Sequence, residues 1–186
     1  ESHPVVNSLI LHHLGHGDIH ARRDIQGMDG NRVDFVDGES AEYDLILLAT
    51  GYQLDYPFIK REHLNWPAAL DAPQLYLNVF HPEYDNLFMM GMIEAAGLGW
   101  EGRNLQARLT ALYIHRHRQG SAQAASFAAT KRQKATTNLD GGYDYIKLAR
   151  IAYYVNKDAY LDALHQHITE LEAGLEQAAP QPVPAT

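Results

Sequence analysis

The sequence predicts an α/β fold that ends in α-helices, and three observations carry that prediction. Short apolar–polar alternation in 17–25 and 32–36 predicts two strands. The continuous apolar run Leu45–Leu48 is typical of a strand that is buried on both faces of an α/β sheet. From residue 103 onward, the apolar residues recur at helical spacing instead. The chain therefore changes from strands to helices near its middle.

The strands of the first half are expected to be joined by a hairpin and a loop. After 32–36, the segment "DGES" supplies an Asp-Gly turn in which Gly38 tolerates positive φ. The returning arm, "EYDLILLATGY", contains the apolar run. A loop rich in Pro and aromatic residues follows, and then two further strand candidates, "LYLNVF" (75–80) and "NLFMMGMI" (86–93).

Three helices are expected in the second half. The first, over 103–119, places one apolar stripe toward the core, made by Leu105, Leu109, Leu112 and Tyr113. Its last turn carries Arg116 and Arg118, where the helix dipole favours cations, and Gly120 suits the position just after the helix. A second, Ala-rich helix is expected after Ser121. A last helix, over 159–175, is expected to be capped by Asp158.

The bulk composition narrows the class of protein. The 186 residues are 46% hydrophobic and 20% charged, which is typical of a globular protein. A net charge of -8 with no basic face argues against a nucleic-acid partner, and no apolar run approaches the ~20 residues of a membrane helix. The absence of cysteine excludes disulfides and thiolate sites and fits the cytoplasm. The chain starts without Met, so we expect the C-terminal part of a longer protein.

The run "LHHLGHGDIH", 11–20, raises the question of a metal site. On a strand His16, Asp18 and His20 would share a face, but at ~3.3 Å per residue the two histidine Cα atoms lie ~13 Å apart. Zinc needs each nitrogen within ~2.1 Å. A helix would bring His12 and His16 together, but Gly15 and Gly17 disfavour a helix there. We expect no tight zinc site among His12, His13, His16 and His20.

The glycine-rich segment "GLGWEG", 97–102, matches the pattern G-x-G-x-x-G between an expected strand and an expected helix. A dinucleotide fingerprint also needs an acidic residue about 20 positions further on and a second parallel strand, and the sequence offers neither. Two interpretations of this segment remain. It is either a glycine-rich turn or a helix start whose N–H groups face an electron-rich group.

Three segments in series resemble flavin-containing monooxygenases. "EYDLILLATGYQLDYPF" is similar to the family segment in which a buried strand ends in Ala-Thr-Gly-Tyr. "LYLNVFHPEYDNLFMMGMIEAAG" followed by "NLQARL" is similar to the next block of that family, and "ESHPVVNSLILHHLGHGDI" resembles the lead-in of bacterial members. The resemblance covers roughly residues 1–165.

The resemblance implies a Rossmann-like fold with two dinucleotide-binding domains, for FAD and NADP(H). Residues 1–52 would end the NADP-binding domain and return to the FAD domain, of which 53–120 would be the C-terminal part. A helical segment, 121–177, and a disordered tail, 178–186, would follow. In the family, reduced flavin and O2 give a C4a-hydroperoxide that oxygenates a soft nitrogen or sulfur, and the cofactor carries that chemistry. The glycine fingerprints and the catalytic asparagine of the family would precede residue 1, so the chain is expected to be inactive alone.

The resemblance also implies which residues meet the cofactors. Small residues at the carboxyl end of a strand let a ligand approach the backbone, and the next block would pass the pyrimidine edge of the flavin. The helix starting near Gly102 would aim its positive end at the flavin C2 carbonyl. The implied cofactor-binding residues are Ala49, Thr50, Gly51, Tyr52, Gly91, Glu94, Ala95, Gly97 and Leu98.

Other functions stay open at this point. A Baeyer–Villiger or N-hydroxylating flavoprotein monooxygenase would share the three segments, and a truncated, non-catalytic binding or regulatory module would lack the N-terminal part altogether. In the enzyme readings the partners are a small N- or S-containing substrate, O2 and the N-terminal FAD/NADP-binding part of the same polypeptide.

Overall fold

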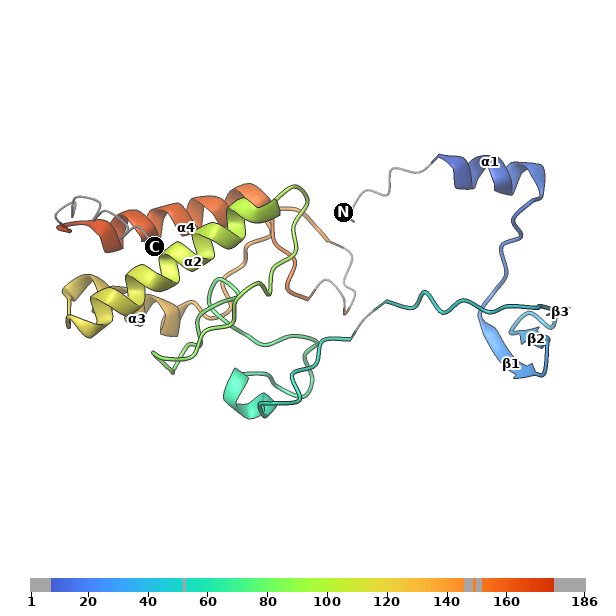
Figure 1. The fold of residues 1–186 in the computed structure, drawn as a ribbon, viewed down its shortest axis with the longest axis horizontal. Helices are drawn as coiled ribbons and strands as arrows, with labels where there is room; N and C mark the ends of the chain where they lie inside the picture. The colour runs from blue at the N-terminus through green and yellow to red at the C-terminus, as the bar shows by residue number, and fades with distance from the viewer. Residues whose placement is uncertain (1–7, 52, 146–148, 150–151, 176–186) are drawn as a thin grey trace, which may run out of the picture. The chain divides into compact units, whose positions relative to one another are not determined.

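The computed structural model describes residues 8–51, 53–145, 149 and 152–175, and their elements are labelled in Figure 1. The chain divides into two compact units at residues 51 and 52. We call 8–51 the N-terminal unit and the described residues from 53 onward the C-terminal unit. The predicted tail 178–186 lies outside the described residues.

The N-terminal unit holds a three-stranded antiparallel sheet in the order β1-β2-β3 (Figure 1). Its strands are β1 (Ile25–Asp29), β2 (Arg32–Phe35) and β3 (Ser40–Glu42). Val33 and Phe35 on β2 are buried. Gly38, at φ +85°, makes the turn from β2 to β3, which confirms the hairpin that the Asp-Gly pair predicts.

Most of the histidine run lies in a helix. The strand predicted over 17–25 is wrong for all but its last residue. Helix α1 spans Leu9–His16, and β1 begins only at Ile25. The glycines do not prevent the helix: Gly15 costs only about 1 kcal/mol inside it. Gly17, at φ +81°, ends it as a left-handed C-cap.

The apolar run Leu45–Leu48 is not a buried strand among the described residues, contrary to prediction. Leu45, Leu47 and Leu48 are 82%, 83% and 77% exposed, and no strand pairs with the run. A strand buried on both faces needs neighbours on both edges and layers on both sides. The described residues provide the run with neither.

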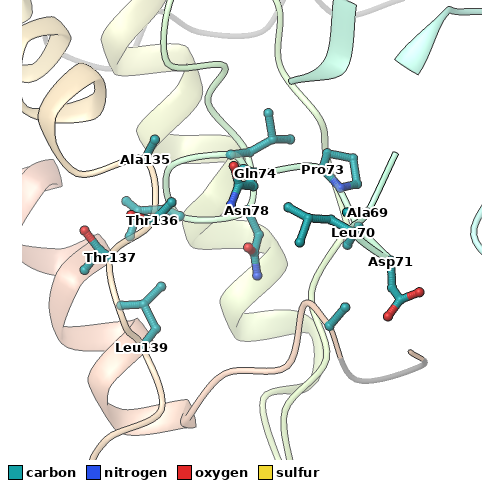
Figure 2. A pocket seen from close by; sticks show the side chains of 14 residues that line it. Ala69, Leu70, Asp71, Pro73, Gln74, Asn78, Ala135, Thr136, Thr137 and Leu139 are labelled. Carbon is teal, nitrogen blue, oxygen red and sulfur yellow. The ribbon is translucent and has the colours of Figure 1, made fainter. Parts of the chain in front are cut away.

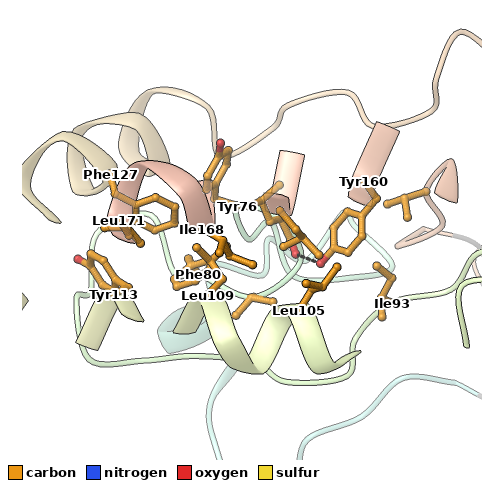
Figure 3. Packing of buried hydrophobic residues seen from close by; sticks show 14 of the residues in the cluster. Tyr76, Phe80, Ile93, Leu105, Leu109, Tyr113, Phe127, Tyr160, Ile168 and Leu171 are labelled. Carbon is orange, nitrogen blue, oxygen red and sulfur yellow. Dashed lines mark hydrogen bonds between the residues drawn. The ribbon is translucent and has the colours of Figure 1, made fainter. Parts of the chain in front are cut away.

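The C-terminal unit is built on three helices that share one core. Helix α2 (Gly99–Arg118) packs against α3 (Ala122–Gln133) and α4 (Lys157–Glu172), and a short 3₁₀ helix, η1, spans Arg61–Leu64. The predicted stripe is confirmed: Leu105, Leu109 and Tyr113 are buried, and Leu112 packs at its edge. Figure 3 shows this stripe against side chains of α3, α4 and the 75–93 segment.

The helix ends agree with the sequence in part. The helix expected after Ser121 is confirmed as α3, and Ser121 caps it, its hydroxyl accepting a hydrogen bond from the Ala124 N–H at 3.2 Å. The cap of α4 is Asn156 and not Asp158, which lies in the first turn instead. Helix α2 begins at Gly99, earlier than expected. Arg116, in the last turn of α2, is buried because its guanidinium donates to the carbonyls of Leu171 and Ala173 at the end of α4.

The segments 75–80 and 86–93 are not the two strands that the sequence predicts. The chain reverses at Leu77 and Asn78, whose φ values are +53° and +55°. Tyr76 and Phe80 therefore pair with each other across a tight turn, and Phe80 also forms an isolated bridge with Phe88. Apolar alternation does not distinguish such a buried turn from a strand, because both place side chains in the core.

Candidate functional site

The predicted cofactor-binding residues fall into both units. Ala49, Thr50 and Gly51 are exposed at the end of the N-terminal unit, and Tyr52 lies outside the described residues. The others lie together in one segment of the C-terminal unit, which we call the 91–98 loop: Gly91, Glu94, Ala95, Gly97 and Leu98. The structure thus brings five of the nine residues together.

The 91–98 loop has an exposed side and an anchored side. Gly91, Glu94 and Gly97 are exposed, so their surfaces are accessible to a ligand. Ala95 and Leu98 are buried members of the hydrophobic core. Their side chains hold the loop in place, and only their backbone remains for contact with a ligand.

Hydrogen bonds from distant elements fix the backbone of this loop. The Glu94 carbonyl accepts from the Val155 N–H at 3.0 Å, and the Ala96 N–H donates to the Tyr154 hydroxyl at 3.0 Å. At the start of the loop, the Gly91 N–H donates to Oε1 of Gln106 on α2 at 3.3 Å. The loop is therefore held along its length before any ligand is present.

The glycines of the loop and of "GLGWEG" each have a local reason. Gly97 and Gly99 have φ values of +74° and +55°, and Gly91 has +82°, a region that side-chain-bearing residues avoid. A Cβ on Gly102 would lie 2.5 Å from the side chain of Leu98, so the close packing requires glycine. Turn geometry and packing account for the pattern, in agreement with the reading that disfavours an ADP-binding fingerprint.

The loop leads directly into the N-terminus of α2. No side chain caps this helix start, whereas Ser121 and Asn156 cap α3 and α4. The first-turn N–H groups of a helix carry partial positive charge and donate hydrogen bonds to an electron-rich partner. Trp100, beside them, is 84% exposed, an unusual position for a large aromatic side chain.

The histidines of α1 contact one another and Asp18. The rings of His12 and His16 lie 4.1 Å apart, and Nδ1 of His13 contacts the Asp18 carboxylate at 3.0 Å. Within the described part of the chain, no group of three or more His, Cys, Asp or Glu side chains is placed to hold a metal ion. The absence of a tight zinc site stays a prediction.

A pocket of about 310 Å³ lies elsewhere in the C-terminal unit, and Figure 2 shows its lining. The walls come from 69–78, from 135–139 and from Ala152. Leu70, Pro73 and Leu139 supply apolar surface, and Asn78 and Thr136 supply polar groups. None of the predicted site residues lines this pocket.

The sequence analysis did not predict two buried polar groups, the Tyr160 hydroxyl and the Gln106 amide. The Tyr160 hydroxyl accepts from Nε2 of Gln106 at 2.7 Å and donates to the Leu77 carbonyl at 2.7 Å. Burial raises the pKa of Tyr160 above its ordinary value, so the phenol stays neutral. Gln106 follows Leu105 on the buried face of α2, and a polar residue at such a position needs internal hydrogen-bond partners. A glutamine on the apolar face of a predicted helix therefore indicates a buried hydrogen-bond partner.

A second buried pair joins Tyr76 to α4. The Tyr76 hydroxyl lies 2.6 Å from Nε2 of His167, and Nδ1 of His167 lies 2.9 Å from the Glu170 carboxylate. Burial, and then the Glu170 charge, raise the pKa of Tyr76 to about 12. The phenol is a hydrogen-bonding group of the core at neutral pH. No sequence signal pairs residues 91 positions apart.

Comparison with known proteins identifies a family and a similar protein. The family described as flavin-binding monooxygenase-like matches residues 1–170. Indole-3-pyruvate monooxygenase YUCCA4 of Oryza sativa subsp. japonica is 37% identical over 59 residues, which are 32% of this chain and only 13% of the rice protein. No solved structure matches the chain. Among the described residues no helix is both long and apolar enough to cross a membrane. Since the family match covers most of the chain, this protein belongs to the flavin-binding monooxygenase-like family.

Proposed function

We propose that the chain is the C-terminal portion of an FAD- and NADPH-dependent monooxygenase that oxygenates a soft nitrogen or sulfur nucleophile. The family match over 1–170 carries the proposal. An N-terminal part of the same polypeptide would hold the glycine-rich phosphate loops of both cofactors, since neither fingerprint occurs in this sequence. On this view the fragment is inactive alone.

The proposed domain boundaries follow the same division. Residues 1–52 would end the NADP-binding domain, 53–120 would complete the FAD-binding domain, and 121–177 would be a C-terminal helical segment before the tail. The exposure of Leu45, Leu47 and Leu48 supports this proposal. An apolar run of that kind is expected to become a buried strand once a Rossmann-like sheet from the N-terminal part supplies its neighbours.

The 91–98 loop suits the edge of a flavin ring. A Cβ built on Gly91 would meet nothing within 4 Å, and Gly97 and Glu94 are exposed beside it. A flat ring can approach a backbone that carries no side chain, and the uncapped start of α2 provides partial positive charge for a carbonyl oxygen. When bound, the flavin would supply the redox and oxygen chemistry, and this loop would orient its edge.

The Ala49–Gly51 segment of the N-terminal unit is also proposed to contact a dinucleotide cofactor. Gly51 has a φ of +81° and open space at its Cβ position, which supports a close approach by a ligand. Ala49 and Thr50 are small and exposed beside it. We propose that Tyr52 completes this contact.

A second candidate is oxygenation of a carbonyl compound, the Baeyer–Villiger class. The name of the rice relative favours this candidate, since indole-3-pyruvate is a 2-oxo acid. The two candidates share the flavin site and differ in the substrate.

Flavin retention tests the proposed function. The chain of 186 residues, purified alone, is expected to be colourless and unable to oxidise NADPH, because it lacks the loop that would bind the charged pyrophosphate. The protein encoded by the complete reading frame is expected to retain flavin in equal molar amount. Absorbance spectra of both preparations give the answer. A yellow preparation of the chain alone refutes the fragment proposal, and a complete protein with no affinity for flavin refutes the function.

A further inference from the structure

We infer that Gln106 is a positioning residue that sets the backbone of Gly91 for the flavin. The inference rests on the proposed function, because the 91–98 loop is the part of this chain proposed to meet the ring. Gln106 lies on α2, 15 residues after Gly91, and its side chain is completely buried.

The amide of Gln106 bridges the loop to the core. Its Oε1 accepts from the Gly91 N–H at 3.3 Å, and its Nε2 donates to the Tyr160 hydroxyl at 2.7 Å. Tyr160 in turn donates to the Leu77 carbonyl at 2.7 Å, the hydrogen bond drawn in Figure 3. One side chain thus connects the loop, α2, α4 and the left-handed turn at Leu77.

The donor and the acceptor of each hydrogen bond in this series, from Gly91 through Gln106 and Tyr160 to Leu77, are fixed. The Tyr160 hydroxyl has one proton, which it donates to the Leu77 carbonyl. Toward Gln106 the hydroxyl oxygen can therefore only accept a hydrogen bond. The Gly91 N–H needs an acceptor. Only a group with a donor on one side and an acceptor on the other satisfies both, and a neutral amide is such a group. An apolar side chain of the same size leaves two polar groups without this partner.

Both polar groups of the Gly91 backbone have a hydrogen-bond partner within the protein. Its N–H is used by Gln106, and its carbonyl accepts from the Ile93 N–H at 2.8 Å. What Gly91 offers is an open surface at φ +82°, where a Cβ would meet nothing within 4 Å. The orientation of that peptide decides whether the surface stays flat, and Gln106 holds the orientation from the buried side.

A merely structural role for Gln106 makes a different prediction. A buried amide that only stabilises the core would, when replaced, lower stability without a specific effect on the loop. Leu109, one turn further along α2, is the matched control, because it is equally buried and contacts the core through apolar atoms only. Leu109→Ala reports what loss of core stability alone does.

The first test measures hydrogen exchange of the Gly91 amide in the flavin-free protein. Gln106→Met is expected to speed exchange at Gly91 about tenfold relative to neighbouring loop amides, the equivalent of one net hydrogen bond. Gln106→Glu keeps an acceptor for the Gly91 N–H but, when ionised, offers Tyr160 no donor, so it is expected to restore only part of the protection at Gly91. Leu109→Ala is expected to change exchange across the unit evenly. Equal, even changes in Gln106→Met and Leu109→Ala overturn the inference.

The second test measures the flavin dissociation constant of the complete protein. Gln106→Met is expected to weaken flavin binding about tenfold, more than Leu109→Ala does at equal loss of melting temperature. Unchanged flavin binding in Gln106→Met overturns the inference while the proposed function stands. Failure of the wild-type protein to bind flavin overturns the proposed function instead, and the exchange experiment still decides whether Gln106 positions Gly91.

Discussion

Lys131→Met is expected to lower the free energy of unfolding by about 3 kcal/mol, as for loss of one partner of a buried ion pair. The Lys131 side chain is 0% exposed, and its Nζ lies 2.9 Å from the Asp85 carboxylate. It also donates to the carbonyls of His81 and Pro82, each at 2.8 Å, and of Tyr84 at 3.2 Å. Methionine fills similar volume but leaves these acceptors without the ammonium. Urea unfolding at neutral pH measures the difference.

Arg132→Met is the matched control for this change. Arg132 is the next residue along α3 and pairs with the other Asp85 oxygen at 3.1 Å, but its side chain is 43% exposed, against 0% for Lys131. Exposed pairs contribute only about 0–1 kcal/mol, so the control is expected to have a small effect. Equal losses in the two variants would show that burial of Lys131 does not matter.

The effect of Lys131→Met is also expected to depend on pH. Burial alone would raise the pKa of Asp85, but hydrogen bonds from Tyr113 and Lys131 outweigh it and hold the pKa below its ordinary value. A carboxylate of lowered pKa stabilises the fold above its unfolded pKa of about 3.9, and this stability is lost as the pH falls through the folded pKa. The difference between wild type and Lys131→Met should therefore shrink as the pH falls below about 4. A pH-independent difference contradicts the ionic account.

Gly97→Asp, in the complete flavoprotein, is expected to weaken flavin retention or lower the flavin reduction potential. If the 91–98 loop passes the pyrimidine edge, the substitution adds bulk and a negative charge beside a ring that is electron-rich when reduced. Two unit charges at ~4 Å and an effective dielectric near 20 repel by about 4 kcal/mol, which strongly disfavours an anionic reduced flavin. A potentiometric titration measures the potential.

Gly120→Asp controls for the backbone and for the added charge. Gly120, at φ +63°, follows the far end of α2, and a Cβ there meets nothing within 4 Å. Gly97, at φ +74°, meets only Cδ of Lys157 at 4.0 Å, so both substitutions strain the backbone similarly. Gly120→Asp should leave the potential unchanged. If Gly97→Asp instead lowers the melting temperatures of apo and holo protein equally and leaves the potential intact, the glycine serves only the fold.

The helices of the C-terminal unit could be predicted because their signals are local. The stripe of Leu105, Leu109 and Tyr113 repeats at helical spacing, and Ser121 is a side chain that caps helices. The turn at Gly38 is likewise specified by two adjacent residues. Each of these features depends on a few neighbouring residues, so the sequence alone indicates it.

The errors concern features that depend on distant parts of the chain. The run Leu45–Leu48 has the composition of a buried strand, but a strand forms only where neighbouring strands are present. The carbonyl of Leu77, in the left-handed turn, accepts a hydrogen bond from Tyr160, 83 residues away. Local patterns carry no information on such partners. Residues 91–98 were predicted from resemblance, and Gln106, which contacts Gly91 from α2, was not.

Oxygen labelling tests the central claim most directly. The complete protein, supplied with NADPH, ¹⁸O₂ and a soft sulfur probe such as methyl phenyl sulfide, is expected to form the sulfoxide with label from O2, in step with NADPH oxidation. Mass spectrometry of the product gives the label. An unlabelled product, or NADPH oxidation by the flavin-loaded protein without oxygenation of the probe, contradicts the account.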